Sequence, residues 1–286
     1  MAEIIDGKHV SSVLRNKIAD DTASFINKTG IVPGLAVIIV GDDSASKVYV
    51  RNKHKACLDV GFKSFQIELD SSTKEDELLK IIDKLNNDSS VHGILVQLPL
   101  PSHIDEKRVI ERISPIKDVD AFHPSNVGRI MIGEYNFLPC TPAGVIALLD
   151  YYKVDICGKK CVVLGRSNIV GKPMAMLLLQ RHGTVIICHS KTENIEQICS
   201  EADILVSAIG KSGFVKSHMI KPGAVVIDVG INRDSDGKLC GDVMFDDVKN
   251  LASMITPVPG GVGPMTITML LNNTLLAAKK QKELIC

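Results

Sequence analysis

The sequence lacks an excess of charge of either sign. Its 33 basic side chains balance its 33 acidic ones, which leaves a formal net charge of zero at pH 7. Proteins that bind nucleic acid or an anionic membrane surface through bulk charge have a clear basic excess. We therefore expect no nucleic-acid partner and no membrane partner, although a local basic patch is compatible with this composition.

Long hydrophobic runs are also missing, and so are paired cysteines. No apolar stretch reaches the length of a membrane-spanning helix, and Met1-Ala2-Glu3 has neither the basic flank nor the following apolar segment of a secretory signal. The 8 cysteines are scattered without a Cys-x-x-Cys pair, so we interpret them as reduced, buried thiols rather than disulfides or zinc ligands. These absences predict a cytoplasmic protein without a metal site.

The sequence does contain a regular alternation of strand and helix patterns, with 45% apolar residues over 286 positions. Strands that alternate with helices pair in parallel and are covered on both faces, so the fold class we predict is α/β. Two blocks show this pattern, and they are separated by a proline-rich stretch at 99–141. The predicted strands are 34–40, 65–69 and 93–97 in the first block, and 160–164, 185–188, 204–208, 225–229 and 254–255 in the second.

We therefore predict two lobes with a ligand site in the cleft between them. One is an N-terminal α/β sheet domain of residues 1–140, to which the last helix returns with residues 267–286. The other is a C-terminal Rossmann-like domain of residues 141–266, which binds a dinucleotide. A helix that starts near Thr141-Pro142 connects the lobes.

A glycine turn in the second block predicts the dinucleotide. The apolar strand 161–164 leads into Gly165-Arg166-Ser167-Asn168-Ile169-Val170-Gly171, and an apolar helical pattern follows, with Pro173 in its first turn. Free amides and the dipole at such a helix start favour an anion. An ordinary tight turn would have the same glycines, but the strand before it and the helix after it favour a nucleotide site.

The residues around this turn favour NADP over NAD. Sites for NAD usually place Asp or Glu after the second strand, where the ribose 2′-hydroxyl lies. This sequence has Ser190 and Lys191 there, and Arg166 in the glycine turn can hold a phosphate. Solvated surface residues would give the same pattern. Ile231 follows a later strand and is placed to flank the nicotinamide, whereas Asp228 is either a structural residue or a ligand contact.

The first block offers three polar features, and each has an ordinary structural alternative. Tyr49 and Lys53 share a helix face at i and i+4, as many surface pairs do. Gln97 ends an apolar strand, where it could simply cap the sheet edge. Asp118 and Asp120 lie in an irregular segment that could be a solvated loop. The late segment 256–266 is rich in glycine and proline, which lets its backbone approach a ligand closely.

Five motifs follow one another along the chain. They are Tyr-x-x-x-Lys at 49–53, Val-Gln-Leu-Pro-Leu at 96–100, Lys-Asp-Val-Asp at 117–120, Gly-Arg-Ser-x-x-Val-Gly-x-Pro at 165–173 and Pro-Gly-Gly-Val-Gly-Pro-Met-Thr at 259–266. With these motifs the sequence resembles the bifunctional methylenetetrahydrofolate dehydrogenase/methenyltetrahydrofolate cyclohydrolase family over nearly its whole length. We expect the short, freestanding form, because no ligase segment follows.

The resemblance implies an activity and a set of site residues. The activity is oxidation of 5,10-methylenetetrahydrofolate with NADP, followed by hydrolysis of the methenyl product to 10-formyltetrahydrofolate, in a homodimer formed through the cofactor lobes. The implied catalytic residues are Lys53, Tyr49, Gln97 and Asp120, which also bind the folate substrate together with Val96, Leu98, Pro259, Gly260, Gly261, Val262 and Gly263. The implied NADP contacts are Gly165, Arg166, Ser167, Ser190 and Ile231.

One residue departs from the family pattern. Ala121 stands where glycine commonly follows the second aspartate, and we expect its methyl group to shift the pterin pocket slightly without abolishing binding. Asp120 can accept two N–H bonds from the pterin edge. Lys53 can act as a base when neutral or stabilise charge when protonated, and the sequence leaves both open.

Three competing interpretations remain at the sequence level. One is a dehydrogenase of another substrate, such as a shikimate-type enzyme, and Tyr49, Lys53, Gln97 and the segment 259–266 count against it. The others are a non-catalytic NADP-binding regulator and a dehydrogenase without the hydrolase. Lys53 argues against both, because neither has a need for a desolvated lysine.

Overall fold

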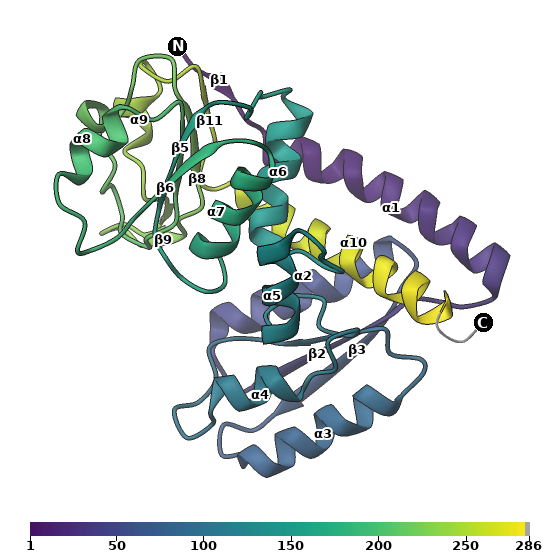
Figure 1. Ribbon diagram of the computed structural model, residues 1–286. Helices are drawn as coiled ribbons and strands as arrows, with labels where there is room; N and C mark the ends of the chain where they lie inside the picture. Colours follow the sequence, from purple (N-terminus) through teal and green to yellow (C-terminus); the bar gives the residue numbers. More distant parts are fainter. Residues whose placement is uncertain (284–286) are drawn as a thin grey trace. The chain divides into compact units, whose positions relative to one another are not determined.

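The computed structural model describes residues 1–283, apart from the side chains of 44–46. The chain forms two compact units, which share no sheet (Figure 1). The six-stranded unit consists of residues 1–12 and 139–266, and the three-stranded unit consists of residues 13–138 and 267–286, of which 284–286 lie outside the described residues. The predicted α/β class with two sheets is confirmed. The predicted cleft concerns the placement of the units and stays a prediction.

Six parallel strands form the sheet of the six-stranded unit. In spatial order they are β1 (Glu3–Ile4), β11 (Met254–Ile255), β8 (Val225–Asp228), β7 (Ile204–Ser207), β5 (Lys160–Leu164) and β6 (Thr184–Cys188). The chain goes from β5 outward to β6 and then returns to β7 on the other side of β5. The carboxyl ends of β5 and β7 therefore mark the switch point where ligands bind in such sheets.

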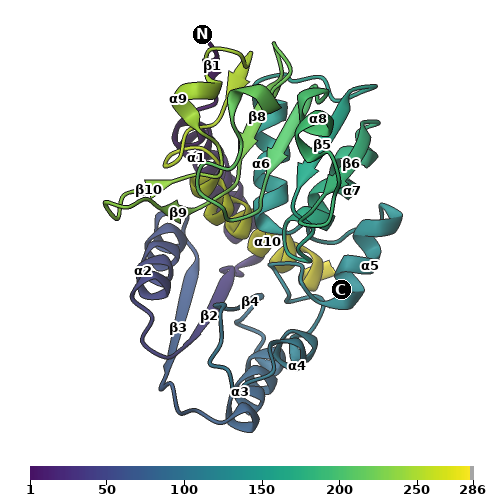
Figure 2. The same ribbon diagram turned by 90° about the vertical axis from the view of Figure 1, so that its left-hand side faces the viewer.

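Helices cover both faces of this sheet, with α6 and α7 on one face and α8 and α9 on the other (Figures 1 and 2). The helices are α6 (Cys140–Tyr151), α7 (Gly171–Gln180), α8 (Ile195–Ser200), α9 (Phe245–Val248) and the 3-10 turn η1 (Ser217–Met219). A short antiparallel hairpin, β9 (Asn232–Arg233) and β10 (Leu239–Cys240), follows β8. Because both faces are covered, the strands are mostly apolar, with polar residues at some of their ends, such as Lys160 and Asp228.

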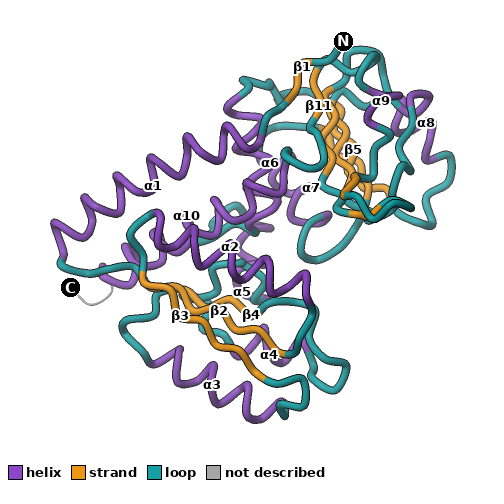
Figure 3. Tube along the Cα trace, turned by 180° about the vertical axis from the view of Figure 1, so that it is seen from behind, coloured by secondary structure: helices purple, strands orange, loops and turns teal. Residues whose placement is uncertain are grey.

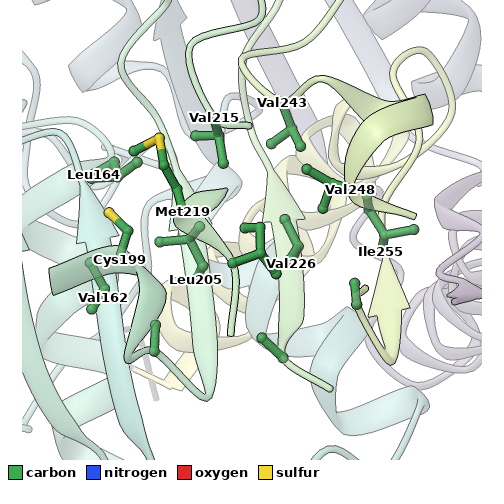
Figure 4. Packing of buried hydrophobic residues seen from close by; sticks show 14 of the residues in the cluster. Val162, Leu164, Cys199, Leu205, Val215, Met219, Val226, Val243, Val248 and Ile255 are labelled. Atoms are coloured by element: carbon green, nitrogen blue, oxygen red, sulfur yellow. The ribbon is translucent and has the colours of Figure 1, made fainter. Parts of the chain in front are cut away.

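The core on the α8 and α9 side is built from short aliphatic side chains (Figure 4). Leu205 and Val226 come from neighbouring strands, and Met219 and Val248 cover them from η1 and α9. All four are almost completely buried. Close packing of these side chains holds the strand ends in fixed positions, which a ligand site at those ends requires.

Residues 1–12 belong to the six-stranded unit, which corrects the expectation that they are part of the first lobe. Strand β1 pairs in parallel with β11, and the Ile5 amide donates to the Ile255 carbonyl at 2.9 Å. The side chain of Ile5 is completely buried there. Glu3 and Ile4 form a strand too short to show a periodic pattern, and nothing in the sequence indicates this pairing.

The three-stranded unit contains a parallel sheet in the order β3-β2-β4. Its strands are β2 (Gly34–Val40), β3 (Lys63–Leu69) and β4 (Gly93–Val96), and its helices are α2 (Ser44–Asp59), α3 (Glu75–Asn87), α4 (Glu106–Arg112) and α5 (Pro124–Ile132). Figure 3 shows α2 along one face of the sheet and α3 along the other. Ile38 and Ile94 of the sheet pack against Leu78 and Ile82 of α3.

Two long helices continue from one unit into the other. They are α1 (Gly7–Thr29) and α10 (Val262–Glu283). Within residues 1–283, no helix is long and apolar enough to cross a membrane. The 7 described cysteines are all free, and of these Cys157 is exposed and Cys240 half-buried while the others are buried. Cys286 lies outside the described residues.

Candidate active site and cofactor site

Lys53 and Gln97 are brought together in the three-stranded unit. Lys53 lies on α2 with only 8% of its surface exposed, and its Nζ donates to Gln97 Oε1 at 2.8 Å. Gln97 directly follows β4, and its Nε2 donates to the Leu98 carbonyl at 2.7 Å. That second bond fixes the amide with its oxygen toward the lysine. The result is a desolvated amine of defined direction.

Helix α2 places Lys53 on its buried face and leaves Tyr49 nearer to solvent. Val50 and Cys57 flank Lys53 at helical spacing and are buried, whereas Tyr49 is 40% exposed. Burial raises the pKa of the Cys57 thiol to about 12, although a hydrogen bond with Ser64 lowers it in part. Cys57 is therefore a protonated, inert thiol at neutral pH. The proton chemistry of this helix face belongs to the lysine.

The segment Lys117-Asp118-Val119-Asp120 contains two structural charges and one that is less enclosed. Buried Lys117 donates to the carbonyls of Leu85 and Asp88 at 2.9 and 2.7 Å, which caps the end of α3. Burial lowers the pKa of Lys117. The sequence analysis considered only the two carboxylates here and missed this anchoring lysine.

Asp118 fixes the backbone that follows it. Its Oδ2 accepts from the amide of His123 and from Asn126 Nδ2, both at 2.8 Å. Burial raises the pKa of Asp118, against the effect of these hydrogen bonds. Asp120 is only half-buried, so it is the carboxylate of the pair that a ligand can reach. Ala121 has φ +58°, a left-handed conformation that glycine adopts without steric cost and other residues adopt rarely, so the alanine at this position is strained.

The glycine turn in the six-stranded unit has no room for side chains. Gly165 has φ +112°, and a Cβ there would lie 2.3 Å from the Ala208 carbonyl oxygen. A Cβ on Gly171 would lie 2.2 Å from the Gly165 oxygen. Ser167 Oγ accepts from the amides of Val170 and Gly171 at 3.1 and 3.2 Å, just where α7 begins. The first turn of α7 contains no acidic residue, so its dipole favours an incoming anion.

A cavity of about 460 Å³ opens where β5, β6 and β7 end. It is lined by Gly165, Arg166, Ser167, His189, Ser190, Thr192, Ile195, Ala208, Ile209, Lys211 and Phe214. None of these residues is acidic, and Arg166 and Lys211 are cationic. The tight glycine turn and this cationic lining fit a phosphorylated dinucleotide. Of the expected cofactor residues, only Ile231 is not part of the lining, and it lies exposed after β8.

The segment 259–263 lies in the six-stranded unit, packed against the start of α1. The amide of Lys8 donates to the Gly260 carbonyl at 3.1 Å. A Cβ on Gly7 would lie only 1.7 Å from the Gly261 oxygen. Contact with Gly7, which the sequence analysis did not single out, therefore fixes the path of the loop. The expected folate residues thus come from both units.

Two buried aspartates support the carboxyl end of the sheet. Asp228 accepts from the amides of Gly230, Asp242 and Val243 at 2.9 to 3.0 Å. Of the two roles considered for it, structural residue or ligand contact, these bonds support the structural one. Burial raises its pKa to about 6. Asp242, completely buried, was missed by the sequence analysis. A charged residue directly before the apolar Val243-Met244-Phe245 was the available indication.

Comparison with known proteins places the chain in a family. The family described as tetrahydrofolate dehydrogenase/cyclohydrolase matches with its catalytic domain over residues 5–120 and with its NAD(P)-binding domain over residues 139–282. The bifunctional protein FolD of Acetivibrio thermocellus is 58% identical over 283 residues, which cover 99% of each chain. The chain belongs to the tetrahydrofolate dehydrogenase/cyclohydrolase family.

Solved structures of this family agree with the fold. The bifunctional FolD methylenetetrahydrofolate dehydrogenase/cyclohydrolase of Campylobacter jejuni matches with a TM-score of 0.96 at 48% identity, covering 98% of this chain and 100% of the other. The Trypanosoma brucei FolD, complexed with NADP cofactor and inhibitor, matches with a TM-score of 0.94 at 42% identity, covering 98% of each chain. The predicted family is therefore confirmed, and a shikimate-type enzyme is excluded. Lys53, Gln97 and Asp120 fall in the catalytic-domain match, and the cavity falls in the NAD(P)-binding match.

Proposed function

We propose that this chain oxidises 5,10-methylenetetrahydrofolate to the 5,10-methenyl form with NADP, and hydrolyses that product to 10-formyltetrahydrofolate. Membership of the dehydrogenase/cyclohydrolase family supports both reactions. The observation on which the hydrolysis rests most directly is the buried Lys53, held at 2.8 Å by Gln97.

The cofactor site is proposed in the cavity of the six-stranded unit. The amides at the start of α7 and the turn Gly165–Ser167 would hold phosphate, and Arg166 and Ser190 would face the phosphate on the adenine ribose. Exposed Ile231 would flank the nicotinamide. NADP supplies a hydride acceptor, so the task of these residues is to fix its position.

Folate-binding residues are proposed in each of the two units separately. Asp120 would accept N–H bonds from the pterin edge, because it is the less buried carboxylate of its segment. Tyr49, Val96 and Leu98 would border the ring system from the three-stranded unit. The backbone of 259–263 would contact the folate from the six-stranded unit. Hydride transfer requires the folate and the nicotinamide to be bound in contact with each other.

Lys53 would move a proton during hydrolysis. As a water oxygen bonds to the methenyl carbon, the neutral amine takes up a proton from that water. When the bond from this carbon to N5 breaks, Lys53 returns the proton to N5 and the hydroxyl proton leaves to solvent. One water is consumed and one proton is released. Gln97 keeps the amine aimed, since its own amide is fixed by Leu98.

We further propose residues 13–138 and 267–286 as the folate domain and the other unit as the NADP domain. Family resemblance supports a homodimer formed through the NADP domains. A cytoplasmic location is supported by the free thiols of the 7 described cysteines, as expected in a reducing compartment.

The test is a coupled assay with methylenetetrahydrofolate and NADP or NAD, which follows NADPH and the appearance and decay of the methenyl absorbance. No methenyl formation with either cofactor would exclude the proposal. Lys53→Met should abolish the decay while NADP binding, measured by calorimetry, stays unchanged. Lys55→Met is the matched control, because Lys55 is an exposed lysine on the same helix. Decay at the wild-type rate in the Lys53 variant would remove Lys53 from its role.

A further inference from the structure

Lys211 is a second cation on the wall of the cofactor cavity, in addition to Arg166 of the glycine turn. Arg166 enters the cavity from the loop after β5, and Lys211 enters it from the loop after β7. Within residues 1–283, neither of the two forms an ion pair, and no acidic residue lines the cavity. Two uncompensated cations in one cavity favour a ligand group with more than one negative charge.

Buried Asp242 fixes the loop that presents Lys211. Its Oδ2 accepts from the amides of Ile209 and Gly210 at 2.8 and 3.3 Å and from Ser207 Oγ at 3.1 Å. Its Oδ1 accepts from the amide of Lys211 at 2.9 Å and from Asn232 Nδ2 at 3.0 Å. Five donors around one buried carboxylate hold three consecutive residues in place.

The side chain of Lys211 is also guided toward the cavity. Its Nζ lies 6.0 Å from the centre of the Phe214 ring, and both residues line the cavity. A cation over an aromatic ring is attracted to the ring face at about this separation. The ring therefore gives the flexible lysine a preferred position at the cavity wall.

The position of Lys211 within the cavity points to one phosphate of the cofactor. The pyrophosphate belongs at the glycine turn and the start of α7. Four residues after β6, namely His189, Ser190, Thr192 and Ile195, share the cavity with Lys211. In dinucleotide-binding sheets, the substituent on the adenine ribose lies at the end of the strand that corresponds to β6 here. Lys211 thus lines the same cavity as the residues next to the part of the ligand in which NADP has a phosphate and NAD a hydroxyl.

We propose that Lys211 selects NADP by pairing with its 2′-phosphate together with Arg166, and that Asp242 is the positioning residue for Lys211. The proposal rests on the proposed function, because it presumes NADP as the cofactor. It extends the set of specificity residues beyond Arg166 and Ser190.

The test measures binding by calorimetry rather than turnover. Lys211→Gln should weaken NADP and adenosine 2′-phosphate about tenfold, as expected for a lost charge-assisted contact, and leave NAD and adenosine 5′-phosphate within about twofold. The effect on NADP should shrink at high salt. Lys216→Gln is the matched control, because Lys216 is an exposed lysine of the same unit that does not line the cavity.

The outcomes distinguish a failure of the Lys211 assignment from a failure of the proposed function. Equal losses for NADP and NAD would overturn the 2′-phosphate assignment, and unchanged NADP binding would remove Lys211 from the site. If the wild-type protein bound neither NADP nor adenosine 2′-phosphate, the proposed function itself would fail.

The role of Asp242 is tested by hydrogen exchange without cofactor. Asp242→Asn should speed amide exchange at residues 209–211 and weaken NADP more than NAD. Asn232→Ala, which removes one donor to Asp242, should do the same to a smaller extent and covers the case in which the first variant fails to fold. Asp236→Asn in the exposed hairpin turn serves as control. Unchanged exchange at 209–211 in both variants would contradict the positioning role.

Discussion

Burial gives neighbouring charged residues different tasks in this protein. Lys117 and Asp118 are buried. Lys117 donates to backbone carbonyls, and Asp118 accepts from backbone amides and from Asn126, whereas Asp120 is only half-buried. Buried charges of this kind need such partners, since an unpaired one is strongly destabilising. At the scale of single residues, the reactive groups are therefore those with a fixed direction and remaining access.

Arg166 should discriminate between the two nicotinamide cofactors. Arg166→Ala is expected to weaken NADP about tenfold or more in equilibrium binding and to affect NAD little, because a guanidinium pairs with phosphate but gains little from a hydroxyl. Lys172→Ala is a suitable control, since that lysine lies in the first turn of α7, contacts Asn168 at 2.7 Å and does not line the cavity. An equal loss for both cofactors would refute the 2′-phosphate assignment.

At the scale of elements, the ends of strands are set by contacts from outside those strands. The carboxyl end of β8 is held by Asp228, which binds the amides of Asp242 and Val243 beyond the β9–β10 hairpin. The start of α7 is held by Ser167, which accepts from the Gly171 amide. The glycines of the turn let its backbone lie close to the Ala208 carbonyl. These contacts, more than helix or strand propensity, fix where each element stops and where a ligand can lie.

Asp228 should make stability depend on pH. Its pKa is raised from 3.8 to about 6 because burial outweighs its hydrogen bonds and nearby Asp242 adds repulsion. The folded protein therefore holds this proton more tightly than the unfolded chain, and the free energy of unfolding falls as pH rises from about 4 to about 6, by about 3 kcal/mol from this group. Above about pH 6 that loss is complete.

Urea unfolding of the wild type and of Asp228→Asn across pH 4 to 7 measures this contribution. The variant loses acceptors at every pH, so only the change in the difference between the two proteins is informative. That difference should narrow as pH rises, because only the wild type has a group here that ionises. A difference that stays constant across this range would show that Asp228 does not titrate there.

At the scale of the whole molecule, the chain crosses between its two compact units three times, near residues 12, 138 and 266. The first residues complete the edge of the six-stranded sheet, and the last helix ends in the three-stranded unit. Each unit is therefore assembled from segments far apart in sequence. Such contacts form late and at a higher entropic cost than local ones.

Ile5→Ala should consequently destabilise the six-stranded unit, although residue 5 is near the N-terminus. Loss of a completely buried side chain is expected to lower the free energy of unfolding by about 2–3 kcal/mol. Hydrogen exchange should rise in residues 139–266 and not in 13–138. Ile4→Ala is the matched control, because the neighbouring Ile4 at the end of β1 is 42% exposed, and its loss should change stability little. Faster exchange confined to 13–138 would contradict this assignment.

Much of the architecture could be predicted because its determinants are local. The run 160–164 coincides with β5 (Lys160–Leu164), and 34–40 with β2 (Gly34–Val40), since buried parallel strands are continuous apolar segments. Two-residue strands have no period, so of the four among the described residues only β11 (Met254–Ile255) was predicted, and β1 and the hairpin β9–β10 were missed. The motifs also named the family, which the comparisons confirm.

The sequence by itself determined the two α/β sheets, the glycine turn that bends β5 into α7, and the family, because each depends on neighbouring residues whose spacing is visible along the chain. Only the tertiary structure decided that Lys117 and Asp118 are anchors, that residues 1–12 complete the six-stranded sheet, and that Asp242 holds the loop of Lys211 across more than thirty positions. Burial, and hydrogen bonds between residues far apart in the sequence, depend on how the chain packs. A periodic pattern in the sequence does not predict them.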